Sequence, residues 1–168
     1  MPGPDFRHDP HPQADPAHRQ TGSEPASIVV VDPSPLSLIA TAGIMHSQGY
    51  GCVCARTAEG AIEALQMKTQ DLLLWDVADD PATVLETIDQ MRTLADYQQL
   101  AVVMLADSRW AGLEKKAEAM SVPTRCLFKP IDPNSLLAVV DHLLWMPSLV
   151  SAHRRRGSKP SRPGWVTL

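Results

Sequence analysis

Short apolar strands alternate with helical segments five times along this chain, and that alternation limits the possible folds more than any other feature. The predicted strands are residues 28–31, 51–55, 71–75, 100–105 and 125–128. A helix between consecutive strands requires parallel pairing through right-handed crossovers, which place helices on both faces of the sheet. The pattern therefore predicts an α/β fold of three layers, built on a doubly wound, five-stranded parallel sheet.

The predicted helices begin where capping residues or prolines follow the strands. Their expected starts are Ser34 with Pro35, Thr57, Pro81, Ser108, and Asp132 with Pro133. We expect the second helix to end near Met67 and the fourth to run to about Met120. Apolar residues at helical spacing give each of these segments one face that can pack on the sheet.

The 168 residues are enough for one hydrophobic core and not for two. Residues 1–26 are rich in Pro, His and Asp without apolar periodicity, which predicts a disordered N-terminal tail that is not a secretory signal. Residues 27–148 carry all the strand and helix patterns and form the predicted domain. Residues 149–168 form a basic C-terminal tail, which contains five Lys or Arg and no acid.

The predicted domain is acidic, because residues 27–150 contain fifteen acidic and eight basic residues. This balance argues against a nucleic-acid-binding face and leaves the tail as the only basic candidate. No apolar stretch reaches the roughly eighteen residues of a membrane span. Cys52, Cys54 and Cys126 lack the spacing of a zinc site, so we expect buried reduced thiols in a cytoplasmic protein.

Three charged residues follow three of the predicted strands. Asp32 ends the first, Asp76 ends the run Leu72-Leu73-Leu74-Trp75, and Lys129 follows the fifth. The carboxyl ends of parallel strands lie at one edge of the sheet, where open α/β sheets bind ligands. Two acids and one lysine at this edge predict a small site for a divalent cation and a phosphoryl group; a simple ion pair is the alternative.

Three motifs occur in the order that one known family requires: VVVD ending at Asp32, DLLLWDV around Asp76, and FKP around Lys129. With them, the chain from residue 27 to about residue 146 resembles the receiver domain of two-component response regulators. The resemblance implies a flavodoxin-like sheet with strand order 2-1-3-4-5 and a cis peptide bond at Lys129-Pro130. It also implies a signalling protein and not an enzyme.

The resemblance implies a role for each residue of the site. Asp76 is the expected phosphoacceptor, which takes a phosphoryl group from a histidine kinase or a phosphotransfer protein. Lys129 is the expected phosphoryl contact. Asp32, Asp76 and the backbone carbonyl of Ala78 are the expected magnesium ligands. Output is expected to pass to an unidentified downstream protein, with a possible homodimer through the fourth helix, fifth strand and fifth helix.

The chain also departs from the family pattern. Pro33 stands where a second acid is usual, which predicts weak magnesium binding. Ala106 replaces the usual hydroxyl residue after the fourth strand, and Cys126 replaces the usual aromatic residue of the fifth. A pseudo-receiver that is never phosphorylated and binds partners constitutively is therefore the alternative. A nucleotide-binding or flavin-binding α/β protein is a weaker hypothesis, because no Gly-rich loop follows the first strand.

Several other residues allow two interpretations each. Asp79 or Asp80 could supply the missing acid or could cap the following helix, and Asp107 could cap the next helix or add negative potential. Trp110 and Trp145 are either partly buried or part of one partner surface.

Overall fold

The computed structural model describes the backbone of residues 24–78, 80–94, 97–120 and 122–156, and side chains as far as residue 145. In chain order the elements are β1 (Ser27–Val31), α1 (Pro35–Ser47), β2 (Gly51–Ala55), α2 (Ala58–Met67), β3 (Leu72–Val77), α3 (Pro81–Arg92), β4 (Ala101–Ala106), a 3₁₀ turn η1 (Ser108–Trp110), α4 (Leu113–Glu118), β5 (Thr124–Phe128) and α5 (Pro133–Arg156). Residues 1–23, most of the predicted N-terminal tail, lie outside the described residues.

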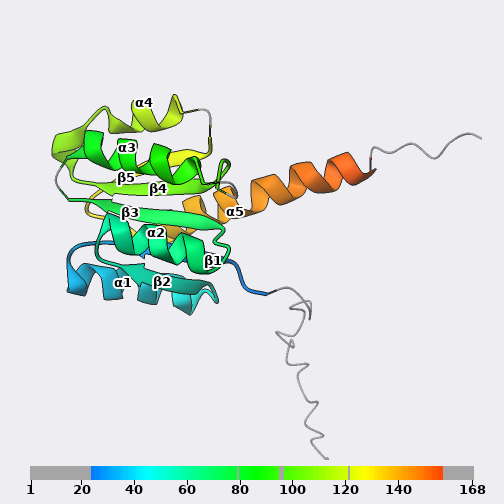
Figure 1. Cartoon of the computed structure of the whole chain (residues 1–168), viewed down its shortest axis with the longest axis horizontal. Helices are drawn as coiled ribbons and strands as arrows, with labels where there is room; N and C mark the ends of the chain where they lie inside the picture. Colours follow the sequence, from blue (N-terminus) through cyan, green and yellow to red (C-terminus); the bar gives the residue numbers. More distant parts are fainter. Residues whose placement is uncertain (1–23, 79, 95–96, 121, 157–168) are drawn as a thin grey trace, which may run out of the picture.

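The five strands pair in parallel in the order β2-β1-β3-β4-β5, which confirms the predicted doubly wound sheet. Figure 1 shows the helices distributed over both sides of this sheet. The strand order reverses direction between β1 and β3, so the carboxyl ends of these two neighbouring strands form the switch point.

Alternating strand residues build two separate cores, one on each face of the sheet. Val29, Val31 and Trp75 belong to the core that includes residues of α2, α3 and α4. Val30 and Leu74 belong to the core that includes residues of α1 and α5. Because β1, β3 and β4 are buried throughout, polar side chains are tolerated only where the strands end, and this is where the charged residues lie.

The predicted helix over residues 108–120 is wrong in one respect, because two elements occupy this segment. The 3₁₀ turn Ser108–Trp110 comes first, and α4 covers only Leu113–Glu118. Gly112 separates them with a φ of 101°, a left-handed conformation that cannot continue an α-helix. Its backbone N–H donates to the Glu114 carboxylate, so the interruption is stabilised by a hydrogen bond.

The last helix is longer than expected. α5 continues to Arg156, past residue 148, so the end of the predicted domain and the first part of the basic tail form one helix. Figure 1 shows this last part extending away from the sheet. Within the described residues, no helix combines the length and apolar character that a membrane span requires.

The thiols are less buried than the sequence predicts. Cys54 is exposed, and Cys52 and Cys126 are partly buried. Cys54 lies on β2, an edge strand with a neighbour on one side only, and this position leaves part of the strand open to solvent. The prediction of three buried thiols is therefore wrong for Cys54.

Candidate functional site

The strongest feature of the candidate site is a contact between Asp76 and Lys129. Asp76 is the fifth residue of β3 and is only 5% exposed. The ammonium of Lys129 donates to the Asp76 Oδ1 atom at 2.8 Å and forms an ion pair with Oδ2 at 2.6 Å. The end of β4 lies between these residues, since Ala106 pairs with Val77 on one side and with Phe128 on the other. The lysine side chain therefore reaches across the end of β4.

Local backbone contacts hold Lys129 at this edge. Its backbone N–H donates to the Ala106 carbonyl at 2.8 Å, which continues the pairing of β4 with β5 by one residue. The Lys129-Pro130 peptide bond is cis, as the resemblance implies.

Asp32 occupies the end of the neighbouring strand β1 and is 3% exposed. Its backbone N–H donates to the Ala55 carbonyl of β2 at 3.1 Å. Its carboxylate accepts the backbone N–H of Ser34 at 2.8 Å. Ser34 is the N-cap residue of α1, as predicted, but its own side chain makes no capping bond. Asp32 thus satisfies one free donor of the helix start while keeping a carboxylate at the edge of the sheet.

The electrostatics of the site are dominated by burial. Burial raises the pKa of the Asp76 carboxyl above its ordinary value, the Lys129 ammonium acts to lower it, and the charge of Asp32 raises it further. Two carboxylates and one ammonium leave the cluster with an excess of one negative charge when all three are ionised. A cation or an electropositive group would relieve this excess.

Comparison with known proteins bears on the fold. No family model and no curated protein matches this sequence. The solved structures that resemble it include the chemotaxis protein CheY4 of Vibrio cholerae, with 21% identity, a TM-score of 0.64, and coverage of 72% of this chain and 100% of that chain. A response regulator receiver domain protein from Clostridium thermocellum has 14% identity and a TM-score of 0.65, with 74% and 98% of the chains covered. A two-component response regulator from Clostridium difficile has 16% identity and a TM-score of 0.62, with 73% and 98% covered.

The fold is that of a response-regulator receiver domain. Strand order, parallel pairing and the helices between successive strands all agree with this assignment. Identities of this size establish architecture, and the roles of individual residues must be argued from the contacts that they make.

The donor chemistry of the candidate site fits magnesium. Two carboxylates, Asp32 and Asp76, and one backbone carbonyl, that of Ala78, are hard oxygen ligands of the kind that Mg²⁺ selects. All three already have protein partners: Asp32 accepts from Ser34, Asp76 from Lys129, and the Ala78 carbonyl from the guanidinium of Arg109 at 3.0 Å. Among the described residues, no cluster of three or more acidic, His or Cys side chains could hold a metal by side chains alone.

The other acids near this edge serve as helix caps. Asp80 accepts the backbone N–H groups of Ala82 and Thr83, and the hydroxyl of Thr83 as well. Asp107 accepts the backbone N–H of Arg109 at the start of η1. The capping interpretation is therefore correct for both acids. Asp79 lies outside the described residues.

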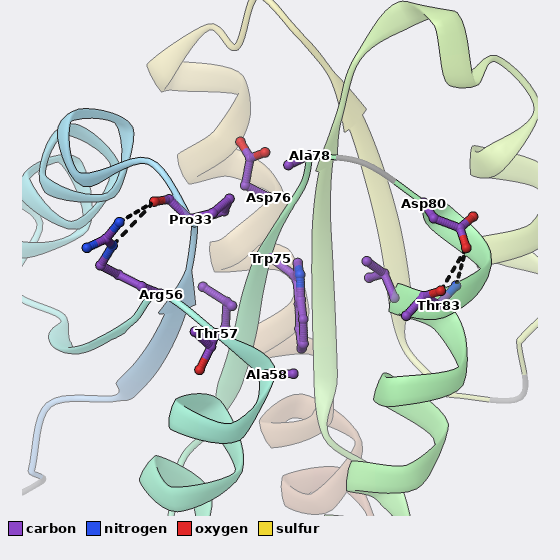
Figure 2. A pocket seen from close by; sticks show the side chains of 11 residues that line it. Pro33, Arg56, Thr57, Ala58, Trp75, Asp76, Ala78, Asp80 and Thr83 are labelled. Carbon is purple, nitrogen blue, oxygen red and sulfur yellow. Dashed lines mark hydrogen bonds between the residues drawn. The ribbon is translucent and has the colours of Figure 1, made fainter.

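A pocket beside Asp76 was not predicted from the sequence. It has a volume of about 260 Å³ and lies between the ends of β1 and β3 and the starts of α2 and α3 (Figure 2). Trp75 and Val84 line its apolar part, while Arg56 donates to the Pro33 carbonyl from its Nε and Nη2 atoms at 3.3 and 3.1 Å. Its lining residues come from four separate segments, so no single sequence motif indicates the pocket.

Trp110 and Trp145 do not form one surface. Trp110 follows the carboxyl end of β4 and packs against the core on the α2 and α3 side. Trp145 is 64% exposed on α5, one turn after Asp141. The hydroxyl of Tyr50, just before β2, donates to the Asp141 carboxylate. The two tryptophans thus lie at opposite ends of the sheet and on opposite faces. Partial burial is correct for Trp110, and the alternative of one surface that includes both tryptophans is wrong.

Proposed function

We propose that this chain is a signalling receiver that accepts a phosphoryl group on Asp76 from a histidine kinase or a phosphotransfer protein. The observation that supports this role best is the contact of the Lys129 ammonium with both oxygens of a nearly buried carboxylate at the switch point of the sheet. A purely structural ion pair does not require this edge, which is the ligand-binding edge of parallel α/β sheets.

The reaction needs positioning and charge neutralisation more than covalent catalysis. An Asp76 oxygen attacks phosphorus in line with the leaving nitrogen of the donor's phosphohistidine, the O–P bond forms, the N–P bond breaks, and the imidazole takes up a proton. Because the Lys129 side chain is 39% exposed, its ammonium has room to turn from the Asp76 carboxylate to the phosphoryl oxygens as the negative charge moves there. When bound, Mg²⁺ supplies further charge neutralisation on those oxygens.

Asp32, Asp76 and the Ala78 carbonyl are the proposed magnesium ligands. We expect weak binding, because Pro33 contributes no carboxylate and Asp80 is occupied as a helix cap. A titration that found tight binding would contradict this expectation. Asp79→Ala would then show whether that acid contributes.

The direct test is to incubate the protein with Mg²⁺ and a small phosphodonor and to measure the mass of the intact chain. We expect one phosphoryl adduct on the wild type and none on Asp76→Asn. Asp107→Asn is a matched control, because this acid is exposed near the same edge and should leave the adduct intact. An adduct that persists in Asp76→Asn would place the modification elsewhere, and no adduct on the wild type would refute phosphoryl acceptance from such donors.

The second candidate is a pseudo-receiver that binds its partner without phosphorylation. Ala106, completely buried, presents a methyl group where a hydroxyl would bond a phosphoryl group, and Cys126 offers no aromatic ring. A ligand shifts a conformational equilibrium only through its different affinity for the two states, and these side chains provide no such difference. In this case the affinity for the partner would be equal in the wild type, with or without phosphodonor, and in Asp76→Asn.

The proposed partners are a histidine kinase or phosphotransfer protein and a downstream protein, in the cytoplasm. A homodimer through α4, β5 and α5 is proposed as well. Sedimentation of the wild type over a range of concentrations would test this dimer, and a monomer at every concentration would refute it.

A further inference from the structure

Arg109 makes a contact at the acceptor site that the sequence did not predict. Its Nη2 atom donates to the carbonyl of Ala78 at 3.0 Å, although the two residues are separated by thirty-one positions. That carbonyl belongs to the loop that follows Asp76, and it is one of the three oxygens proposed to hold magnesium. The guanidinium and a divalent cation would therefore seek the same oxygen.

The position of Arg109 is supported on two sides. Its backbone N–H donates to the Asp107 carboxylate at 3.2 Å, which fixes the start of the 3₁₀ turn. Its guanidinium carbon lies 5.3 Å from the centre of the Trp110 ring, a distance suited to a cation–π contact. These contacts direct a flexible side chain toward the Ala78 carbonyl and reduce the conformational entropy that it loses on binding there.

The charges of the site also favour a cation beside the Ala78 carbonyl. Asp32 and Asp76 against Lys129 leave one negative charge in excess, and the guanidinium of Arg109 brings a positive charge to the loop after β3. We propose that Arg109 is a resident cation of the acceptor site, which competes with a divalent cation for the Ala78 carbonyl and thereby sets the metal affinity. Metal binding then requires Arg109 to leave the carbonyl. Its exposed position makes that release possible without disturbing the core.

This inference rests on the proposed function only for the location of the metal site. It predicts a property that can be measured without any phosphodonor. Two cations of like charge repel at one oxygen, so removing Arg109 frees a ligand and also removes a repulsion. A charged hydrogen bond to a carbonyl at an exposed position predicts that Arg109→Ala binds metal about three- to tenfold more tightly than the wild type.

The experiment is a calorimetric titration with MgCl₂, repeated with Mn²⁺ and read by electron paramagnetic resonance of the free ion. The matched control is Arg56→Ala. Arg56 also donates to a backbone carbonyl near this edge, that of Pro33, and its substitution removes the same charge. We expect Arg109→Ala to bind both ions more tightly and Arg56→Ala to show a clearly smaller gain. Urea unfolding of each variant provides the check on folding.

Equal gains in the two variants would mean that only the net charge matters, and they would overturn the proposal. An unchanged metal affinity in Arg109→Ala, or no metal binding by the wild type and Arg109→Ala, would overturn it as well. The phosphodonor assay is separate: tighter metal binding in Arg109→Ala together with no adduct on Asp76 would support the role of Arg109 while refuting phosphoryl acceptance.

Discussion

Replacing Lys129 by Met should reveal the energetic cost of the buried Asp76 carboxylate. The substitution keeps most of the aliphatic length of the side chain and removes its charge. Asp76 would then lie at the edge of the sheet at 5% exposure, close to Asp32 and without its ammonium partner. The pKa of Asp76, already raised by burial, should rise further, because the Lys129 contact is the contribution that lowers it.

The expected loss of stability follows from the exposure of the pair. Breaking a fully buried ion pair costs about 3–5 kcal/mol, but Lys129 is 39% exposed and solvent screens the pair, so we expect about 1–3 kcal/mol at pH 8. A carboxyl whose pKa is raised in the folded state contributes stability below its unfolded pKa and loses it as the pH rises through the folded pKa. The cost of Lys129→Met should therefore grow with pH above the ordinary range of Asp.

The assay is urea unfolding followed by tryptophan fluorescence at pH 5 and pH 8. The control is Lys129→Met in the Asp76→Asn background, where residue 76 carries no charge that could lose its partner. We expect most of the cost to disappear in this background, and the resulting double-mutant cycle to measure the pair. A cost that is the same at both pH values and in both backgrounds would refute the electrostatic reasoning and leave only lost packing.

Three further predictions concern a helix cap, a buried guanidinium and the cysteines. Thr57→Ala should cost about 1 kcal/mol by removing the N-cap of α2, and Thr57→Ser should not, as urea unfolding would show. Arg92→Met should cost about 1–3 kcal/mol in the same assay, because Arg92 is buried and donates to the Thr124 hydroxyl at 2.8 Å; Arg92→Lys should not restore stability. Cys54, which is exposed, should react with a thiol reagent before Cys126, whose pKa burial raises to about 11; peptide mapping that finds Cys126 labelled first would contradict this.

The sequence was sufficient to predict the sheet and the charged cluster, because both depend on local rules. Helical segments between strands require parallel pairing, and parallel pairing brings the residues after each strand to one edge. Asp32, Asp76 and Lys129 follow directly from this reasoning. The prediction was wrong in element lengths, as for α4, where Gly112 adopts a left-handed conformation and separates η1 from a shorter helix.

Only the tertiary structure determines which groups from different segments of the chain contact each other. Arg109 lies in η1 and Ala78 follows β3, and no pattern of residue types relates them; their contact depends on how η1 packs after β4. The separation of Trp110 from Trp145 has the same origin, since it depends on which face and which end of the sheet each helix covers. Strand ends are set by periodicity along the chain, whereas the reach of a side chain between loops is set by packing in three dimensions.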